Sequence, residues 1–152
     1  MPQITPFLWF NGQAEEAAQF YTSIFPNSGI GSISRPDPQG PALVVPFSLD
    51  GKPFLALNGG PQFSFTEATS FVISCQNQEE IDHYWSRLTE GGGTPSRCGW
   101  LKDRYGLSWQ VVPAQMGALM TDPDPVKAQR VMAAMMKMDK LDIAALEAAK
   151  AV

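Results

Sequence analysis

The sequence predicts an α+β fold made of two βαβββ modules followed by a helical tail. Short β-rich segments and one helix recur in the same order in both halves of the chain. Each of the two helices carries apolar residues at i, i+3, i+4 and i+7, a spacing that places them on one face. The composition changes after Pro113. An internal duplication is the simplest interpretation of this pattern.

The first module is expected over residues 3–60. An apolar strand at 4–10 precedes a helix that reaches Phe25, and its apolar stripe consists of Ala17, Phe20, Tyr21 and Ile24. Three strands are predicted at 29–34, 43–49 and 53–58. Asp50-Gly51 predicts a hairpin between the last two strands, because both residues tolerate positive φ.

The second module is expected over residues 66–113. A strand at 69–75 precedes a helix at 78–90, and its stripe consists of Ile81, Tyr84, Trp85 and Leu88. Three glycines beginning at Gly91 end that helix. Three further strands are predicted at 94–97, 99–103 and 107–112.

The turn between the last two strands is the clearest local signal. Gly106 is free to adopt positive φ, and Asp103 is expected to cap backbone amides of the turn. Pro113 cannot donate to a strand ladder, so it marks the end of the last strand.

The tail, residues 114–152, is rich in alanine, methionine, lysine and leucine. Asp122-Pro123-Asp124-Pro125 predicts the start of a helix that runs to about Met138, and a last helix is expected at 141–149. Six of the seven methionines lie in this tail: Met116, Met120, Met132, Met135, Met136 and Met138. Packing of the tail on its own domain is favoured over a role as a subunit interface or ligand lid.

Composition restricts the class of protein. The chain has 152 residues, 44% of them hydrophobic, which is enough for one compact domain. Its formal charge of −4 includes no basic run, so we expect no nucleic-acid partner. The sequence shows no signal peptide and no membrane-spanning run, so we expect no membrane partner and a cytoplasmic location. Both cysteines, Cys75 and Cys98, are expected to be reduced.

Several motifs resemble one known family. They are Trp9-Phe10-Asn11-Gly12, Ala14-Glu15-Glu16-Ala17, Phe20-Tyr21, the run from Phe54 to Pro61, and the block from Cys98 to Pro113. The chain resembles the PhnB-like branch of the vicinal oxygen chelate superfamily, which includes glyoxalases, bleomycin-resistance proteins and dioxygenases. Members are often labelled 3-demethylubiquinone-9 3-methyltransferase-like. The resemblance implies a single domain over residues 1–152, a curved sheet that forms a cup, and a homodimer.

The resemblance also locates the positions that hold a metal ion in metal-dependent members. They fall here at Thr5, at Ala56 or Asn58, at Ser70 and at Gln110. None of these residues is His, Glu, Asp or Cys, and neutral oxygens bind hard cations weakly without a carboxylate. We therefore expect no metal and no cofactor. A glycine-rich strand-to-helix turn followed by an acidic residue, typical of nucleotide binding, is also missing from the sequence.

Alternation along the strands predicts which residues line the cup. The candidate ligand-binding residues are Thr5, Phe7, Trp9, Phe54, Asn58, Ser70, Ser108 and Gln110, with Ala56 and Val72 on the same faces. The opposite faces, expected beneath the helices, hold Leu8, Phe10, Leu55, Leu57, Phe71, Ile73, Leu107, Trp109 and Val111. An apolar cup with a few amides and hydroxyls is typical of a small-molecule site, although the aromatic residues also suit a filled interior.

We therefore predict a metal-free protein that binds a small apolar or aromatic molecule. The alternative is an enzyme of the same fold, either a lyase, a transferase or a methyltransferase-like protein, with a weak or substrate-completed metal site. A third possibility is an interaction module that uses the methionines of the tail. The only histidine, His83, is expected on a solvated helix position. Cys98 is a weak candidate nucleophile, because no histidine is available as its base.

Overall fold

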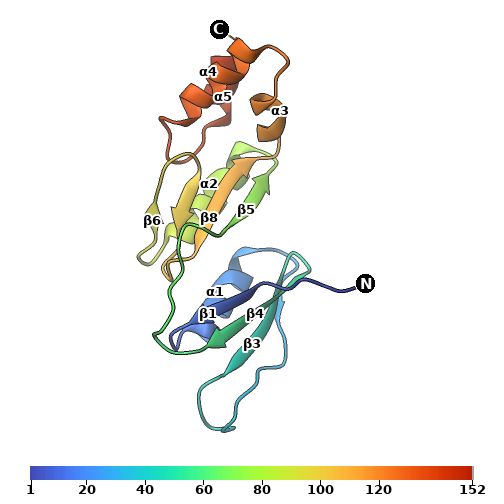
Figure 1. The fold of residues 1–152 in the computed structure, drawn as a ribbon, viewed down its shortest axis with the longest axis vertical. Coiled ribbons are helices and arrows are strands. Elements are labelled where there is room, and N and C mark those ends of the chain that lie inside the picture. Colours follow the sequence, from blue (N-terminus) through green and yellow to red (C-terminus); the bar gives the residue numbers. More distant parts are fainter. Residues whose placement is uncertain (152) are drawn as a thin grey trace. The chain divides into compact units, whose positions relative to one another are not determined.

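The computed structural model describes residues 1–151 and divides into two compact units that meet in the sequence between Phe65 and Thr66 (Figure 1). Each unit contains a four-stranded mixed sheet with a helix, and the second also carries the C-terminal helices. The predicted α+β class and the repeated βαβββ order are confirmed.

The first unit consists of β1 (Phe7–Phe10), α1 (Ala14–Ile24), β2 (Gly29–Ile30), β3 (Val44–Leu49) and β4 (Lys52–Asn58). The strand order is β1-β4-β3-β2, with β1 parallel to β4 and the other pairs antiparallel. β1 starts three residues later than predicted. β2 is shorter than predicted, because only Ser34 of the remaining segment pairs with β3, through a bridge to Val44.

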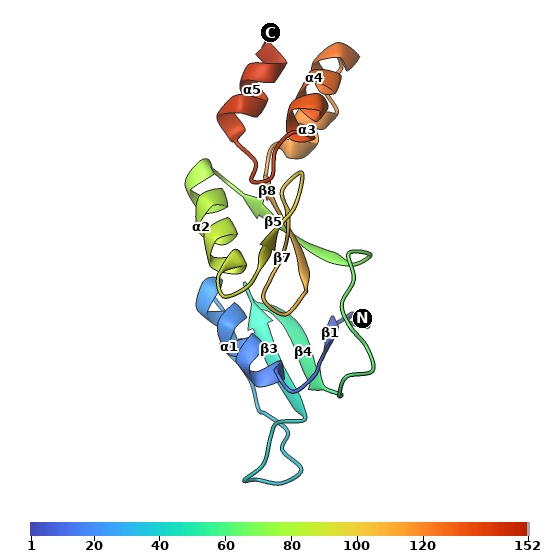
Figure 2. The same cartoon turned by 90° about the vertical axis from the view of Figure 1, so that its left-hand side faces the viewer.

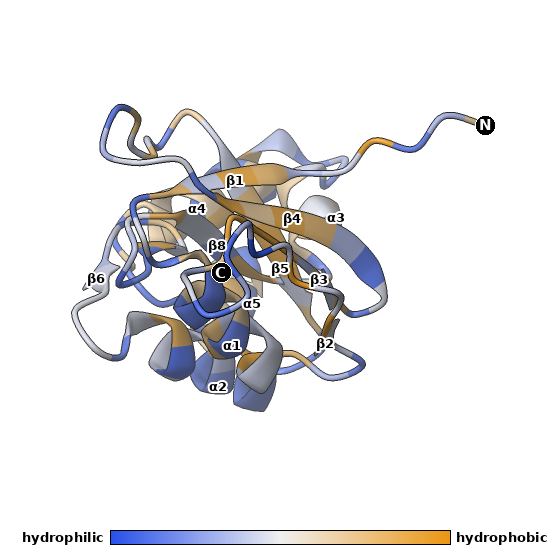
Figure 3. Ribbon diagram, turned by 90° about the horizontal axis from the view of Figure 1, so that it is seen from below, coloured by the Kyte–Doolittle hydropathy of each residue, from blue (hydrophilic) through white to orange (hydrophobic). Residues whose placement is uncertain are grey.

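α1 packs on one face of this sheet. Tyr21 is fully buried and stacks on Phe47 of β3 with ring centroids 6.1 Å apart, and Phe47 stacks on Phe54 of β4 at 5.2 Å. Burial of such aromatic side chains is a large hydrophobic contribution to stability. Figure 3 shows the apolar colouring of β1 and β4.

The predicted hairpin between β3 and β4 is confirmed. Asp50 has φ 52° and Gly51 has φ 74°, and the flanking residues Leu49 and Lys52 are paired in register. Positive φ at both central positions gives the turn a twist that matches the strands.

The second unit begins with β5 (Ser70–Cys75), α2 (Gln78–Thr89), β6 (Thr94–Pro95), β7 (Trp100–Lys102) and β8 (Ser108–Pro113). The strand order is β5-β8-β7-β6, and β5 is parallel to β8. The glycines after α2 break the helix as predicted, because Gly91 and Gly92 adopt φ 70° and 109°.

α2 covers one face of the second sheet (Figure 2). Its residues Ile81 and Leu88 are fully buried, as are Val111 and, almost completely, Leu101 and Trp109 on the strands. The opposite face of this sheet, which we call the second-sheet face, therefore carries the alternate residues of each strand.

The turn between β7 and β8 is held by Asp103. Its carboxylate accepts hydrogen bonds from the backbone N–H of Tyr105 at 2.8 Å and of Leu107 at 3.1 Å. Gly106 has φ 87° and donates its N–H to the Asp103 carbonyl at 3.0 Å. The predicted capping role of Asp103 is confirmed.

The tail forms α3 (Met116–Met120), α4 (Pro125–Met135) and α5 (Ile143–Ala151), which gather beyond the end of β8 (Figure 2). The side chain of Asp124 caps α4, as predicted, by accepting from the Val126 N–H. α3 was not predicted. Leu119, Val131, Leu141 and Leu146 form the core of the tail, with Met116, Met135 and Met138 packed against it.

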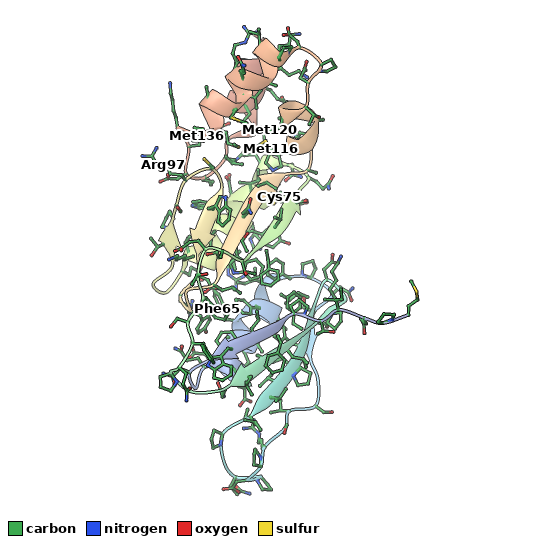
Figure 4. The ribbon with its side chains drawn as sticks, viewed as in Figure 1. Phe65, Cys75, Arg97, Met116, Met120 and Met136 are labelled. Carbon is green, nitrogen blue, oxygen red and sulfur yellow. The ribbon has the colours of Figure 1, made fainter. Side chains whose placement is uncertain are left out.

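Two sets of contacts attach the tail to the rest of the second unit. Gln78 of α2 donates to the Leu141 carbonyl at 3.0 Å and accepts from the Ile143 N–H at 2.8 Å. The N–H of Cys98 bonds the Met138 carbonyl at 2.8 Å. Figure 4 shows Met136 beside Arg97, which precedes Cys98. The favoured prediction, a tail packed on its own unit, is confirmed.

Candidate ligand-binding site on the second-sheet face

Register pairing arranges the side chains of the second-sheet face in two rows. The first row runs across β5, β8, β7 and β6 and consists of Ser70, Ser108, Lys102 and Thr94. The second row consists of Val72, Gln110 and Trp100. Residues paired directly across neighbouring strands have side chains on the same face, so this surface combines hydroxyl, amide, ammonium and indole groups.

A hollow of about 330 Å³ includes residues of both rows in its lining. It is lined by Glu67, Thr94, Pro95, Ser96, Trp100, Leu101, Lys102 and Ser108. Its volume lies at the lower end of the range of roughly 300–1,000 Å³ that is usual for small-molecule sites. Half-buried Trp100 supplies an aromatic surface, and the row neighbours supply polar groups.

Ser108 is the most unusual residue of the hollow. It is 1% exposed, and its hydroxyl has no hydrogen-bond partner among the residues that the structure describes. A buried hydroxyl without a partner costs about 1–3 kcal/mol, so such groups are rare in folded proteins and call for an explanation. The hydroxyl can donate one hydrogen bond and accept others from a bound molecule.

Among the described residues that line the hollow, Lys102 alone has a cationic side chain. Its ammonium forms an ion pair with the carboxylate of Glu67, which lies on the turn before β5. The hydrogen bond from Lys102 is the main cause that holds the pKa of Glu67 below its ordinary value. Both side chains remain partly exposed, so solvent and salt screen this pair.

The structure brings together the three candidate residues predicted from the second module. Ser70 is paired with Ser108, and Gln110 donates from Nε2 to the Ser70 hydroxyl at 2.9 Å. Their predicted common face is confirmed, whereas their role in ligand binding stays a prediction. Trp100 was not among the residues predicted to line the cup, although the pairing of β7 with β8 places it opposite Gln110.

The predicted placement of Phe54, Ala56 and Asn58 on the cup face is wrong. Parallel pairing sets Leu8 opposite Ala56, so these β4 residues lie on the face beneath α1. The amide of Asn58 accepts from the Ala14 N–H at 2.8 Å and donates to the Ala42 carbonyl at 3.0 Å. Asn58 therefore satisfies the N-terminus of α1, a structural role.

The β4 residues on the other face were also misplaced. Leu55 and Leu57 are paired with Phe7 and Trp9 of β1, so they share a face with those residues. They were expected beneath the helix. Thr5 precedes β1 and is half-buried.

Trp9 contacts the loop that follows β4. Its indole N–H donates to the Gly60 carbonyl at 2.9 Å, and its ring meets Phe63 edge-on at 4.9 Å. A Cβ on Gly59 would lie 2.3 Å from the indole ring, so glycine is required at that position. Phe7 is 53% exposed. Ligand binding by Thr5, Phe7 and Trp9 stays a prediction.

The residues at the family's metal positions do not fit a metal ion. Gln110 and Ser70 bond each other, and the Asn58 amide is occupied by backbone groups. Across residues 1–151, no three His, Cys, Asp or Glu side chains gather as a metal site. Neutral amides and hydroxyls bind hard cations weakly, so the donor set at these positions is unsuitable on chemical grounds.

At the start of each helix that packs on a sheet, one backbone N–H is already bonded to a side-chain oxygen. At the start of α1, the Ala14 N–H donates to the side-chain oxygen of Asn58. At the start of α2, the side-chain oxygen of Asn77 accepts from the Glu80 N–H at 2.9 Å. An anion site at a helix start needs such N–H groups to point at the ligand.

The histidine and the two cysteines lie apart from the lining of the hollow. His83 is exposed and meets Tyr84 edge-on at 5.1 Å. Burial raises the pKa of the Cys75 thiol to about 11, with a smaller contribution from Glu80. Half-buried Cys98 lies outside the strands, where its sulfur is 3.6 Å from that of Met136. No helix in the described part of the chain is long and apolar enough to cross a membrane.

The comparisons with known proteins agree with this fold. The family model described as 3-demethylubiquinone-9 3-methyltransferase matches residues 2–112. A solved structure described as a putative 3-demethylubiquinone-9 3-methyltransferase, PhnB protein, from Bacillus cereus is 38% identical. That match covers 73% of this chain and 99% of the other, with a TM-score of 0.67. No curated protein matches the chain.

Two more distant structures share the fold alone. Protein PA1353 from Pseudomonas aeruginosa is 19% identical over 74% of this chain and 98% of its own, with a TM-score of 0.62. A glyoxalase/bleomycin resistance protein from Albidiferax ferrireducens T118 is 15% identical over 70% of this chain and 93% of its own, with a TM-score of 0.50. The chain has the glyoxalase/bleomycin-resistance fold and belongs to the 3-demethylubiquinone-9 3-methyltransferase family of PhnB-like proteins.

Proposed function

We propose that the chain binds a small, partly aromatic molecule in the hollow of the second-sheet face, without a metal ion. The proposal is supported by the buried hydroxyl of Ser108, which has no hydrogen-bond partner within residues 1–151 and lies in a hollow that Trp100 also lines. A ligand that bonds this hydroxyl removes the cost of its burial. The indole of Trp100 offers an apolar surface for a ring.

Thermal denaturation of chelator-treated protein against a panel of small aromatic compounds tests this proposal. Ligands that bind only the folded state raise the melting temperature in a concentration-dependent way. Ser108→Ala and Trp100→Ala are expected to reduce the shift. Ser86→Ala, on an exposed position of α2, is the matched control and leaves it unchanged. A shift that survives both site variants contradicts the proposed location.

The alternative is an enzyme, and the name of the matching family favours methyl transfer. This reaction requires a methyl donor, and the sequence lacks the glycine-rich strand-to-helix turn that is typical of nucleotide binding. S-Adenosylmethionine at millimolar concentration is expected to leave the melting curve unchanged. A clear stabilisation by it, or by Mn²⁺, Zn²⁺ or Ni²⁺, favours the enzyme over the metal-free binding protein.

A homodimer is a separate proposal that rests on the family resemblance. Light scattering coupled to size-exclusion chromatography tests it directly, since the chain mass is 16.6 kDa. Exposed Met132 and Met136 on and after α4 suit either a subunit interface or an interaction partner. Methionine-to-glutamate variants at these two positions change the mass in solution only if this surface forms the dimer interface.

A further inference from the structure

We infer that the hollow selects an aromatic carboxylate, and that Glu67 occupies the position of the ligand's carboxylate when the ligand is absent. This inference rests on the proposed function, because it assigns a ligand class to the same hollow. It is carried by the arrangement of Lys102, Ser108 and Glu67.

Lys102 and Ser108 form the two halves of a carboxylate site. They are paired directly across β7 and β8, so their side chains emerge side by side on the second-sheet face. An ammonium group and a hydroxyl are both donors, and a carboxylate has two acceptor oxygens. One oxygen can take the Lys102 ammonium while the other takes the buried Ser108 hydroxyl. An amide or alcohol of the same shape lacks the charge that strengthens these bonds.

The ion pair with Glu67 shows that the Lys102 ammonium can bind a carboxylate at this place. The carboxylate of Glu67 is paired with Lys102, yet Ser108 has no partner among the described residues, so Glu67 satisfies only half of the site. Glu67 lies on a turn, held locally by the Ala68 N–H bonded to the Thr66 hydroxyl at 3.3 Å. The Glu67 side chain is 62% exposed, so it can leave Lys102 for solvent at small cost.

Trp100 explains why the carboxylate belongs to an aromatic molecule. It precedes Lys102 by two residues on β7, which places both side chains on the same face. The hollow, with a volume of about 330 Å³, is large enough for a compound of one or two rings. When the aromatic ring of the ligand lies on the Trp100 indole, the carboxylate of the ligand is placed at Lys102 and Ser108.

Calorimetric titration with naphthalene-2-carboxylate and with its neutral isostere, naphthalene-2-carboxamide, tests the inference. The wild-type chain is expected to prefer the carboxylate by roughly tenfold. Lys102→Met is expected to remove that preference, and Lys52→Met, on an exposed strand position, retains it.

Glu67→Gln removes the internal competitor and raises carboxylate affinity roughly two- to fivefold without changing carboxamide affinity. Glu79→Gln removes the same charge from an exposed helix position and has no such effect.

The possible failures are distinguishable. Equal binding of both compounds, or a preference that survives Lys102→Met, overturns the inference and leaves the proposed binding function intact. A Glu67→Gln variant with unchanged carboxylate affinity overturns the competitor role of Glu67. Binding of neither compound counts against the proposed function itself.

Discussion

The indole N–H of Trp109 donates to the Asp103 carboxylate at 2.9 Å, and both residues are buried. The two residues follow Lys102 and Ser108 in the sequence, on the face beneath α2. Their hydrogen bond and the backbone bonds to Asp103 fix the hairpin whose other face carries the polar residues of the hollow. The site therefore depends on a buried polar network that takes no part in binding.

Asp103→Ala is expected to lower the free energy of unfolding by about 2–3 kcal/mol, because it leaves buried donors without partners. Urea denaturation measures the change. Asp50→Asn, in the turn of the first-unit hairpin, is the matched control, since asparagine tolerates the observed φ of 52°. A loss for Asp103→Ala no larger than that of the control contradicts the account of this turn.

Gln78→Ala is expected to loosen the start of α5, because Gln78 bonds both the Leu141 carbonyl and the Ile143 N–H. Loss of a bond of this kind should speed hydrogen exchange of the Ile143 amide roughly fivefold. Gln76→Ala is the control, since Gln76 is exposed on the same connection. Equal exchange in the two variants shows that the tail is held by other contacts.

Asn58→Ala is expected to destabilise the first unit by about 1–2 kcal/mol, because the start of α1 loses its side-chain partner. The response to ligand in the hollow stays unchanged. Asn11→Ala, on an exposed position of the same unit, is the control. Loss of ligand response in a stable Asn58→Ala protein would restore the sequence-based prediction that Asn58 contacts ligand.

The two cysteines are expected to differ in reactivity. Half-buried Cys98 reacts with iodoacetamide at pH 8.5, whereas Cys75 is buried and its pKa of about 11 keeps it protonated. Mass spectrometry of the labelled peptides gives the order of reaction.

The raised pKa of Cys75 also predicts how stability depends on pH. A folded-state pKa above the unfolded value contributes stability at low pH, and this contribution is lost as pH rises from about 9 to about 11. Cys75→Ala should show a weaker loss over that interval. An identical pH profile for the variant assigns the alkaline loss of stability to other groups.

The sequence was sufficient for features that depend on local backbone chemistry. Asp50-Gly51, Gly106 and Asp124 form turns and a cap where they were predicted, because each acts within a few residues of its own position. α3 was missed because five residues do not display a helical period.

The face of β4 could not be derived in the same way. Its alternate residues are apolar on both faces, so the pattern fits either orientation. The correct choice follows from pairing with β1, whose residue Leu8 lies more than forty positions before its partner Ala56. In β8, by contrast, buried Trp109 and Val111 alternate with Ser108 and Gln110, and the predicted face was correct.

The most direct test of the binding site is a paired measurement on Ser108→Ala. Without ligand, the variant is expected to be as stable as the wild type or more stable, by up to about 2 kcal/mol, because it lacks a buried hydroxyl that has no partner among the described residues. Naphthalene-2-carboxylate is expected to stabilise the variant less than the wild type. A variant that is less stable without ligand, and equally stabilised by the carboxylate, contradicts the assignment of Ser108 as the ligand's partner.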